Sequence, residues 1–71
     1  MQKPKMPIWH DDQGNNLSCT EKVKVMSQNM DELWQMLQDA YEDALLMGCN
    51  DQQIKMYLED MVKSLHNPYQ K

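Results

Sequence analysis

The sequence predicts a mainly α-helical protein: an antiparallel two-helix hairpin that follows an N-terminal arm and is completed as a four-helix bundle by dimerisation. Apolar residues recur every three or four positions over residues 23–47 and again over 54–65, which is the period of an amphipathic helix. Gly48 separates these stretches, and a glycine at that place typically ends a helix. With 71 residues the chain has room for one small domain.

Residues 1–17 are predicted to form the arm, because they contain Pro4, Pro7 and the turn-forming residues 12–15. The arm is either extended or folded as a short β-hairpin with strands at 8–11 and 16–19. An isolated two-stranded hairpin is marginally stable in water. We therefore expect Ile8, Trp9 or Leu17 to pack on the helices.

The first helix is predicted to cover about residues 19–47. Ser18 and Glu21 have the spacing of a capping box, in which the serine side chain bonds the first turn and the glutamate bonds back. Trp34 and Tyr41 lie beside the apolar stripe and widen it from a two-stranded seam to the face of a helix bundle. The stripe consists of Val23, Met26, Met30, Leu33, Leu37, Ala40, Ala44 and Met47.

The second helix is predicted to cover about residues 51–66. Asn50 is the expected N-cap, Gln53 completes its box, and Asn67-Pro68 is expected to stop the helix. Residues 18–67 then form the helical hairpin, and 68–71 form a C-terminal tail. One face is expected to carry an apolar stripe that consists of Ile54, Tyr57, Leu58, Met61, Val62 and Leu65. Another face is expected to carry a ladder of ion pairs that faces solvent and consists of Asp51, Lys55, Glu59 and Lys63.

The two helices differ in length. At 1.5 Å per residue the first stripe is about 36 Å long and the second helix about 24 Å. In the antiparallel register Ile54 meets Ala44 and Leu45, Leu58 meets Ala40 and Tyr41, Met61 meets Leu37, and Leu65 reaches Leu33 and Trp34. The start of the first helix then lacks a partner within the hairpin. Either the arm or a second copy can cover it, and we expect both to contribute.

The charge pattern is acidic. The net charge is −4, no arginine is present, and residues 25–54 contain six acidic residues and no lysine. This argues against nucleic-acid binding, which requires a basic surface. The expected acidic face is either a solvated surface, a site for a basic partner, or a decoy of a nucleic-acid-binding surface; it comprises Asp31, Glu32, Asp39, Glu42 and Asp43.

Cys19 and Cys49 are the two cysteines, and a continuous first helix between them excludes a disulfide within the chain. This usage fits a reducing compartment, and no apolar run long enough for a membrane span is present, so we expect a cytoplasmic protein. The two thiols suggest, as an alternative function, a thiol- or metal-handling accessory protein. The spacing of cysteines and histidines matches no metal site, and no cofactor is expected.

No catalytic constellation or phosphate-binding loop is recognisable, so we expect a protein that is not an enzyme. Eight methionines favour an adaptable surface that packs on a partner. The first hypothesis is a small protein–protein interaction or regulatory module, with a protein partner or a second copy bound at an exposed helical face. The expected contact residues are Trp9, Met26, Met30, Trp34 and Met36.

Overall fold

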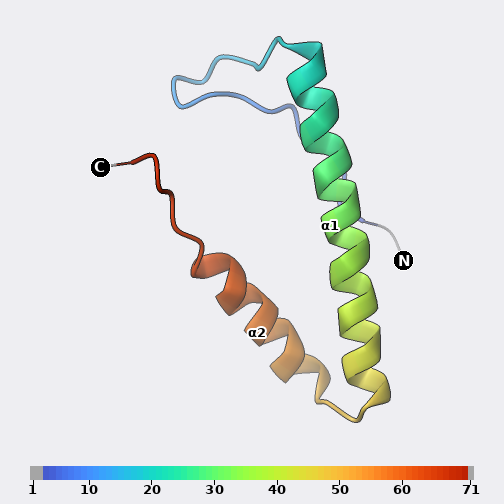
Figure 1. The fold of residues 1–71 in the computed structure, drawn as a ribbon. Coiled ribbons are helices and arrows are strands. Elements are labelled where there is room, and N and C mark those ends of the chain that lie inside the picture. The colour runs from blue at the N-terminus through green and yellow to red at the C-terminus, as the bar shows by residue number, and fades with distance from the viewer. Residues whose placement is uncertain (1–2, 71) are drawn as a thin grey trace. The chain divides into compact units, whose positions relative to one another are not determined.

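The computed structural model describes residues 3–70 and contains two α-helices in contact, joined in a hairpin-like manner (Figure 1). Helix α1 covers Thr20–Leu46, and helix α2 covers Asp51–Lys63. The fold is thus mainly helical, as predicted. The chain divides into two compact units, Met1–Leu37 and Gln38–Lys71, and α1 runs through both.

In the first unit the arm leads into a loop that ends at α1. The predicted strands at 8–11 and 16–19 are absent from the described residues, which contain a single antiparallel bridge between His10 and Asn16. The side chain of Asp11 accepts bonds from the backbone N–H groups of Gln13 and Asn15, both at 2.9 Å, so the loop is organised around this carboxylate. Ile8 is 78% exposed, and without packing on that side no sheet is stabilised.

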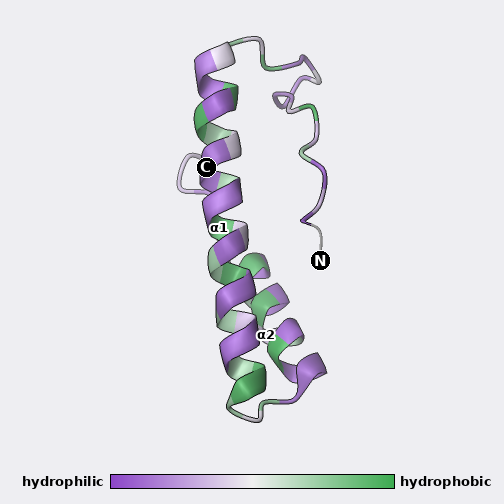
Figure 2. Ribbon diagram, turned by 90° about the vertical axis from the view of Figure 1, so that its right-hand side faces the viewer, coloured by the Kyte–Doolittle hydropathy of each residue, from purple (hydrophilic) through white to green (hydrophobic). Residues whose placement is uncertain are grey.

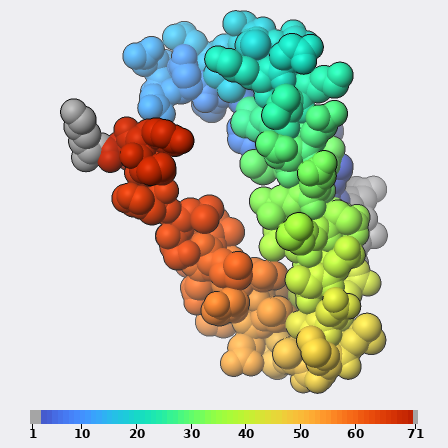
Figure 3. Space-filling model, viewed as in Figure 1, coloured from blue at the N-terminus to red at the C-terminus, as the bar shows by residue number. Residues whose placement is uncertain are grey.

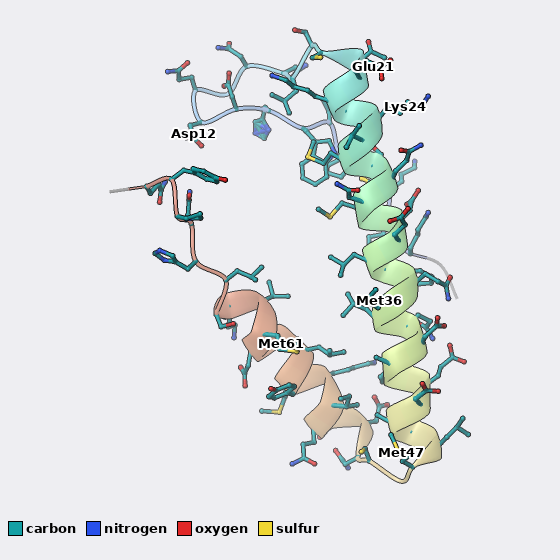
Figure 4. All side chains as sticks on the ribbon, in the orientation of Figure 1. Asp12, Glu21, Lys24, Met36, Met47 and Met61 are labelled. Carbon is teal, nitrogen blue, oxygen red and sulfur yellow. The ribbon has the colours of Figure 1, made fainter. Side chains whose placement is uncertain are left out.

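Helix α1 is continuous from Thr20 to Leu46, as predicted, and passes through Ser27 and Asn29 without a break. Its start differs by one residue from the predicted capping box. The backbone N–H of Val23 bonds to the carbonyl of Cys19 at 3.1 Å, so Cys19 occupies the cap position expected for Ser18. Glu21 and Lys24 lie on the first turns, and Asp12 lies on the loop before them (Figure 4).

The connection between the helices is a Schellman motif. Gly48 has a φ of 94°, which is the left-handed conformation that glycine adopts without strain. The N–H of Cys49 donates to the carbonyl of Ala44 at 2.9 Å, and the N–H of Gly48 donates to the carbonyl of Leu45 at 3.0 Å. The carbonyls of Ala44 and Leu45 are therefore satisfied where the chain turns, and the predicted role of Gly48 is confirmed.

Helix α2 begins as predicted and ends earlier than predicted. The Asn50 side chain accepts a bond from the backbone N–H of Gln53 at 3.0 Å, which confirms the N-cap. The helix ends at Lys63 instead of near residue 66, because Ser64 is its C-cap and donates its hydroxyl to the carbonyl of Met61 at 2.7 Å. Asn67 accepts a bond from the N–H of Tyr69, forming a separate turn after the helix.

The second unit is packed only near the inter-helix turn, where atoms at the end of α1 meet those at the start of α2 (Figure 3). Ala44 is the one buried residue among residues 3–70. Ile54 and Leu58 are half-buried, whereas Met61 is 49% exposed. Leu65 lies outside α2 and is 78% exposed, so it cannot serve as the last contact of the expected register.

Candidate protein-binding surface

The first unit contains an apolar groove between the arm and α1. We use "the arm" from here on for residues 3–9, which run back alongside the first half of the helix (Figures 1 and 2). The groove has a volume of about 240 Å³. We call the apolar side chains of its helical wall the α1 face; these are Met30, Leu33, Trp34 and Leu37, and Asp31 also lines this wall. The opposite wall is formed by Lys3, Pro4, Lys5, Met6, Pro7 and Trp9.

An ion pair fastens one end of the arm to the helix. The ammonium group of Lys3 donates to the carboxylate of Asp31, and the two side chains are 47% and 46% exposed. At this exposure an ion pair contributes about 0–1 kcal/mol, because water and salt screen it. Apolar contacts must therefore supply most of the affinity of the arm for the α1 face.

Trp9 fastens the other end of the arm. Its side chain is half-buried, and its indole Nε1 is enclosed without an acceptor among the described residues. A buried N–H that makes no hydrogen bond costs about 1–3 kcal/mol. Of the side chains expected to pack on the helices, Trp9 lines the groove, whereas Ile8 remains exposed. The fit of the arm on α1 is thus partial.

The five expected contact residues do not form one cluster. Trp9, Met30 and Trp34 line the same groove. Met26 lies in a separate shallow depression with Glu21, Lys22, Val25 and Asn29. Met36 is 68% exposed and lines neither of these; Figure 4 places it near the middle of α1.

Sequence reasoning did not assign Leu33 and Leu37 to the contact surface, although both lie on the apolar stripe and line the groove. It also missed the arm residues Pro4, Met6 and Pro7. The spacing of the two prolines in residues 4–7 was the available indication, since proline favours an extended backbone that can lie along a helix. It does not say which surface the arm contacts.

Of the five acidic residues expected to form the acidic face of α1, Asp31 alone lines the groove. Asp31 and Glu32 belong to the first unit, and Asp39, Glu42 and Asp43 belong to the second; all five are exposed. Asp31 pairs with Lys3, and Glu42 accepts a bond from the side chain of Gln38 at 3.0 Å. Two of these five acidic residues, Asp31 and Glu42, thus make contacts within their own unit.

A polar cluster in the second unit links the two helices. The Tyr41 hydroxyl donates to Asp51 Oδ1 at 2.7 Å. Lys55 Nζ lies 3.8 Å from the same carboxylate oxygen and 5.4 Å from the centre of the Tyr41 ring. Two members of the expected ladder, Asp51 and Lys55, thus contact α1 while their side chains stay more than half exposed. The hydrogen bond to Asp51, with partial burial and the charge of that residue, raises the pKa of Tyr41.

The second unit also exposes apolar side chains at the end of α1, where Figure 2 shows hydrophobic ribbon. Leu46 is 85% exposed and Met47 is 78% exposed. Along α2, Tyr57 and Val62 are also exposed. These side chains extend the apolar surface of the chain beyond the groove.

Both cysteines are free, in agreement with the continuity of α1 between them, and both are exposed. Residues 3–70 contain no group of three or more histidine, cysteine or acidic side chains that could hold a metal ion. Within the same described range, neither helix combines the length and the hydropathy needed to cross a bilayer. No family model, curated protein or solved structure matches the sequence or fold of this chain.

Proposed function

We propose that this protein is a small protein–protein interaction module that binds through the α1 face and the exposed methionines around it. The observation that supports this function best is the continuity of α1, which carries apolar side chains past the part of the helix that α2 contacts. Met30 is 40% exposed, Leu33 47% and Met36 68%. Exposed apolar side chains gathered on one helix commonly form an interaction site.

The small core supports the same function. Ala44 is the one buried residue in the described part of the chain, and a domain of this size with so little burial usually needs a partner, a metal or a disulfide. Both thiols are free, and no metal-binding group is found in residues 3–70. A protein partner would supply the stability that this small core lacks.

We further propose that this partner is a second copy, and that two hairpins complete a four-helix bundle. Two-fold symmetric dimers are the commonest oligomers. Most of the acidic residues do not oppose this association: at 100° per residue, Glu32 projects about 160° from Trp34 and Asp39 about 160° from Leu37. Asp31 lines the groove itself, where it pairs with Lys3. Apart from Asp31, the acidic side of α1 can therefore stay in solvent while the α1 face is covered.

Sedimentation of the full chain at micromolar concentration tests this function. We expect a dimer, and we expect Leu33→Lys to convert it into a monomer because a charge would be placed within the α1 face. The matched control is Val25→Lys, since Val25 is similarly exposed (53%) and lies outside the α1 face. A chain that is monomeric in all three forms contradicts the proposed function.

Two other functions remain open proposals. A thiol- or metal-handling protein is favoured by the exposure of Cys19 and Cys49, and is tested by thiol reactivity. A decoy of a nucleic-acid-binding surface is favoured by the exposed acidic residues of α1, and binding that does not weaken with salt would contradict it.

A further inference from the structure

The surface that the proposed function assigns to a partner is already in contact with the chain's own arm. Met30, Leu33, Trp34 and Leu37 face the arm across the groove. An arm held in this place and a second copy packed on the same side chains exclude one another. If the α1 face mediates association, the arm must either leave it or become part of the interface.

We propose that the arm becomes part of the interface by exchange: in the dimer, residues 3–9 of each copy occupy the groove on α1 of the other copy. This inference rests on the proposed function and deepens it, because it names the segment of the second copy that binds the α1 face. The contacts seen within one chain show that this segment and this groove are complementary. The same contacts are chemically available between two chains.

The complementarity has a charged and an apolar part. Lys3 at one end of the arm pairs with Asp31, in a stretch of α1 that carries no lysine after Lys24. Met6 and Trp9 supply apolar surface to the α1 face. A basic and apolar arm therefore fits an acidic helix with an apolar stripe, whichever copy supplies it.

The arm is held weakly enough within one chain to be exchanged. Its ion pair is about half exposed, Ile8 is largely exposed, and Trp9 Nε1 has no acceptor in the described part of the chain. The groove beside it still contains about 240 Å³ of unfilled space. When two α1 faces approach, side chains of the second copy can fill this space and offer acceptors to the indole N–H.

The connection to α1 is long enough for the exchange. The loop around Asp11 is held by its own hydrogen bonds, from the N–H of Gln13 and Asn15 to the carboxylate and from the N–H of Leu17 to the carbonyl of Trp9. Exchange requires these few bonds to open, so that the loop can extend. Ser18 and Cys19, both exposed and outside α1, are the place where the chain can bend.

The reach of the connection sets the geometry of the exchange. Once the loop has opened, the ten residues between the arm and α1 can span up to about 35 Å. The arm can therefore reach a groove that lies up to this distance from the start of the α1 that it leaves. After exchange, the arm of one copy covers the α1 face of the other, so the two copies are linked. The α1 face can then be covered by an arm and still mediate association.

Disulfide trapping tests the exchange on the full chain. Cys19 and Cys49 are first replaced by serine, and Lys3→Cys and Asp31→Cys are then combined in one chain, since these two side chains are in contact. Oxidation is carried out at a concentration where the chain is dimeric by sedimentation. We expect covalent dimers on a non-reducing gel. Disulfides that close within single chains would overturn the inference.

A mixture of two single variants excludes disulfides within one chain, because each chain then carries a single cysteine. When chains with only Lys3→Cys are mixed with chains with only Asp31→Cys, arm exchange predicts a mixed covalent dimer well above the background from random collisions of thiols. The matched control replaces Asp31→Cys by Glu32→Cys, which lies on a different side of α1. We expect about ten-fold less mixed dimer from the control, because a disulfide requires Cα atoms within about 7 Å.

The outcomes separate this inference from the proposed function. Dimers by sedimentation with disulfides inside single chains would leave the proposed function standing and remove the exchange. A monomeric chain in which the two introduced thiols close a disulfide internally would remove both. Equal amounts of mixed dimer from the test and control pairs would also overturn the exchange, because the arm would then have no fixed place on α1.

Discussion

Tyr41 of α1 donates its phenolic hydrogen to the carboxylate of Asp51, the first residue of α2, over 2.7 Å. This bond joins two residues on either side of the Schellman turn. Lys55 reaches the same pair from the next turn of α2, with Nζ 3.8 Å from the carboxylate and 5.4 Å from the ring centre. The three side chains thus link the start of α2 to the end of α1.

The first prediction concerns pH. The pKa of Tyr41 is raised above its ordinary value of 10.0, mainly because its hydroxyl donates to Asp51. The unfolded chain therefore loses this proton before the folded chain does, so the contribution of Tyr41 to stability is full below pH 10 and disappears as the pH rises through the raised pKa. We expect the urea midpoint, followed by circular dichroism, to fall over this alkaline range.

Tyr41→Phe is the matched variant for this experiment. It keeps the ring beneath Lys55 and removes the hydroxyl, so we expect a lower midpoint at neutral pH and a weaker decline above pH 10. Tyr69→Phe is the control, because Tyr69 is 93% exposed and lies after α2. An alkaline decline of the same size in Tyr41→Phe and in the original chain would contradict this role of Tyr41.

The second prediction concerns the N-cap of α2. Asn50→Ala removes the side-chain acceptor that the N–H of Gln53 uses, and such a loss typically costs about 1 kcal/mol of stability. Gln52→Ala is the control, since this exposed residue lies in the same turn without serving as the cap. Urea unfolding at neutral pH measures both. Equal stability of the two variants would show that the cap does not stabilise α2.

The third prediction concerns Gly48. A Cβ placed there would meet nothing within 4 Å, so the effect of a substitution comes from the backbone alone. With φ at 94°, Gly48→Ala should destabilise the hairpin by about 1–2 kcal/mol. Gly48→Asn should cost less, because asparagine tolerates the left-handed conformation better. Thermal unfolding ranks the variants, and an alanine variant as stable as the original would contradict the geometry of this turn.

The fourth prediction concerns the thiols. Because Cys19 and Cys49 are both exposed, we expect an alkylating reagent to modify each in the folded chain about as fast as in urea. Mass spectrometry of the two single Cys→Ser variants identifies which thiol reacts. Slow modification of one thiol in the folded chain alone would indicate that it is covered by a partner copy.

The parts of the fold that could be predicted from sequence are those determined by a few neighbouring residues. The N-cap at Asn50 and the helix end at Gly48 depend on bonds within one turn, and both predictions are confirmed. The end of α2 was misplaced for a related reason: Ser64 and Asn67 can each interrupt a helix, and the sequence does not say which acts first. The hydrogen bond from the Ser64 hydroxyl to the Met61 carbonyl shows that Ser64 ends the helix before Asn67 is reached.

Contacts between distant residues were harder to predict. The ladder of α2 was expected to face solvent, yet Asp51 and Lys55 reach Tyr41, because the crossing of two helices depends on the whole interface. Trp9 was expected among the contact residues, but its pairing with Trp34 in one groove depends on the path of the arm. Periodicity identifies an apolar face and leaves open which segment covers it.

The continuity of α1 has a thermodynamic consequence. One helix supplies a wall of the groove in the first unit and half of the hairpin in the second. Helix formation is cooperative, so melting either half shortens a hydrogen-bonded ladder that the other half also uses. Occupation of the groove would therefore reduce fraying of the hairpin, and the two units would communicate through the backbone that they share.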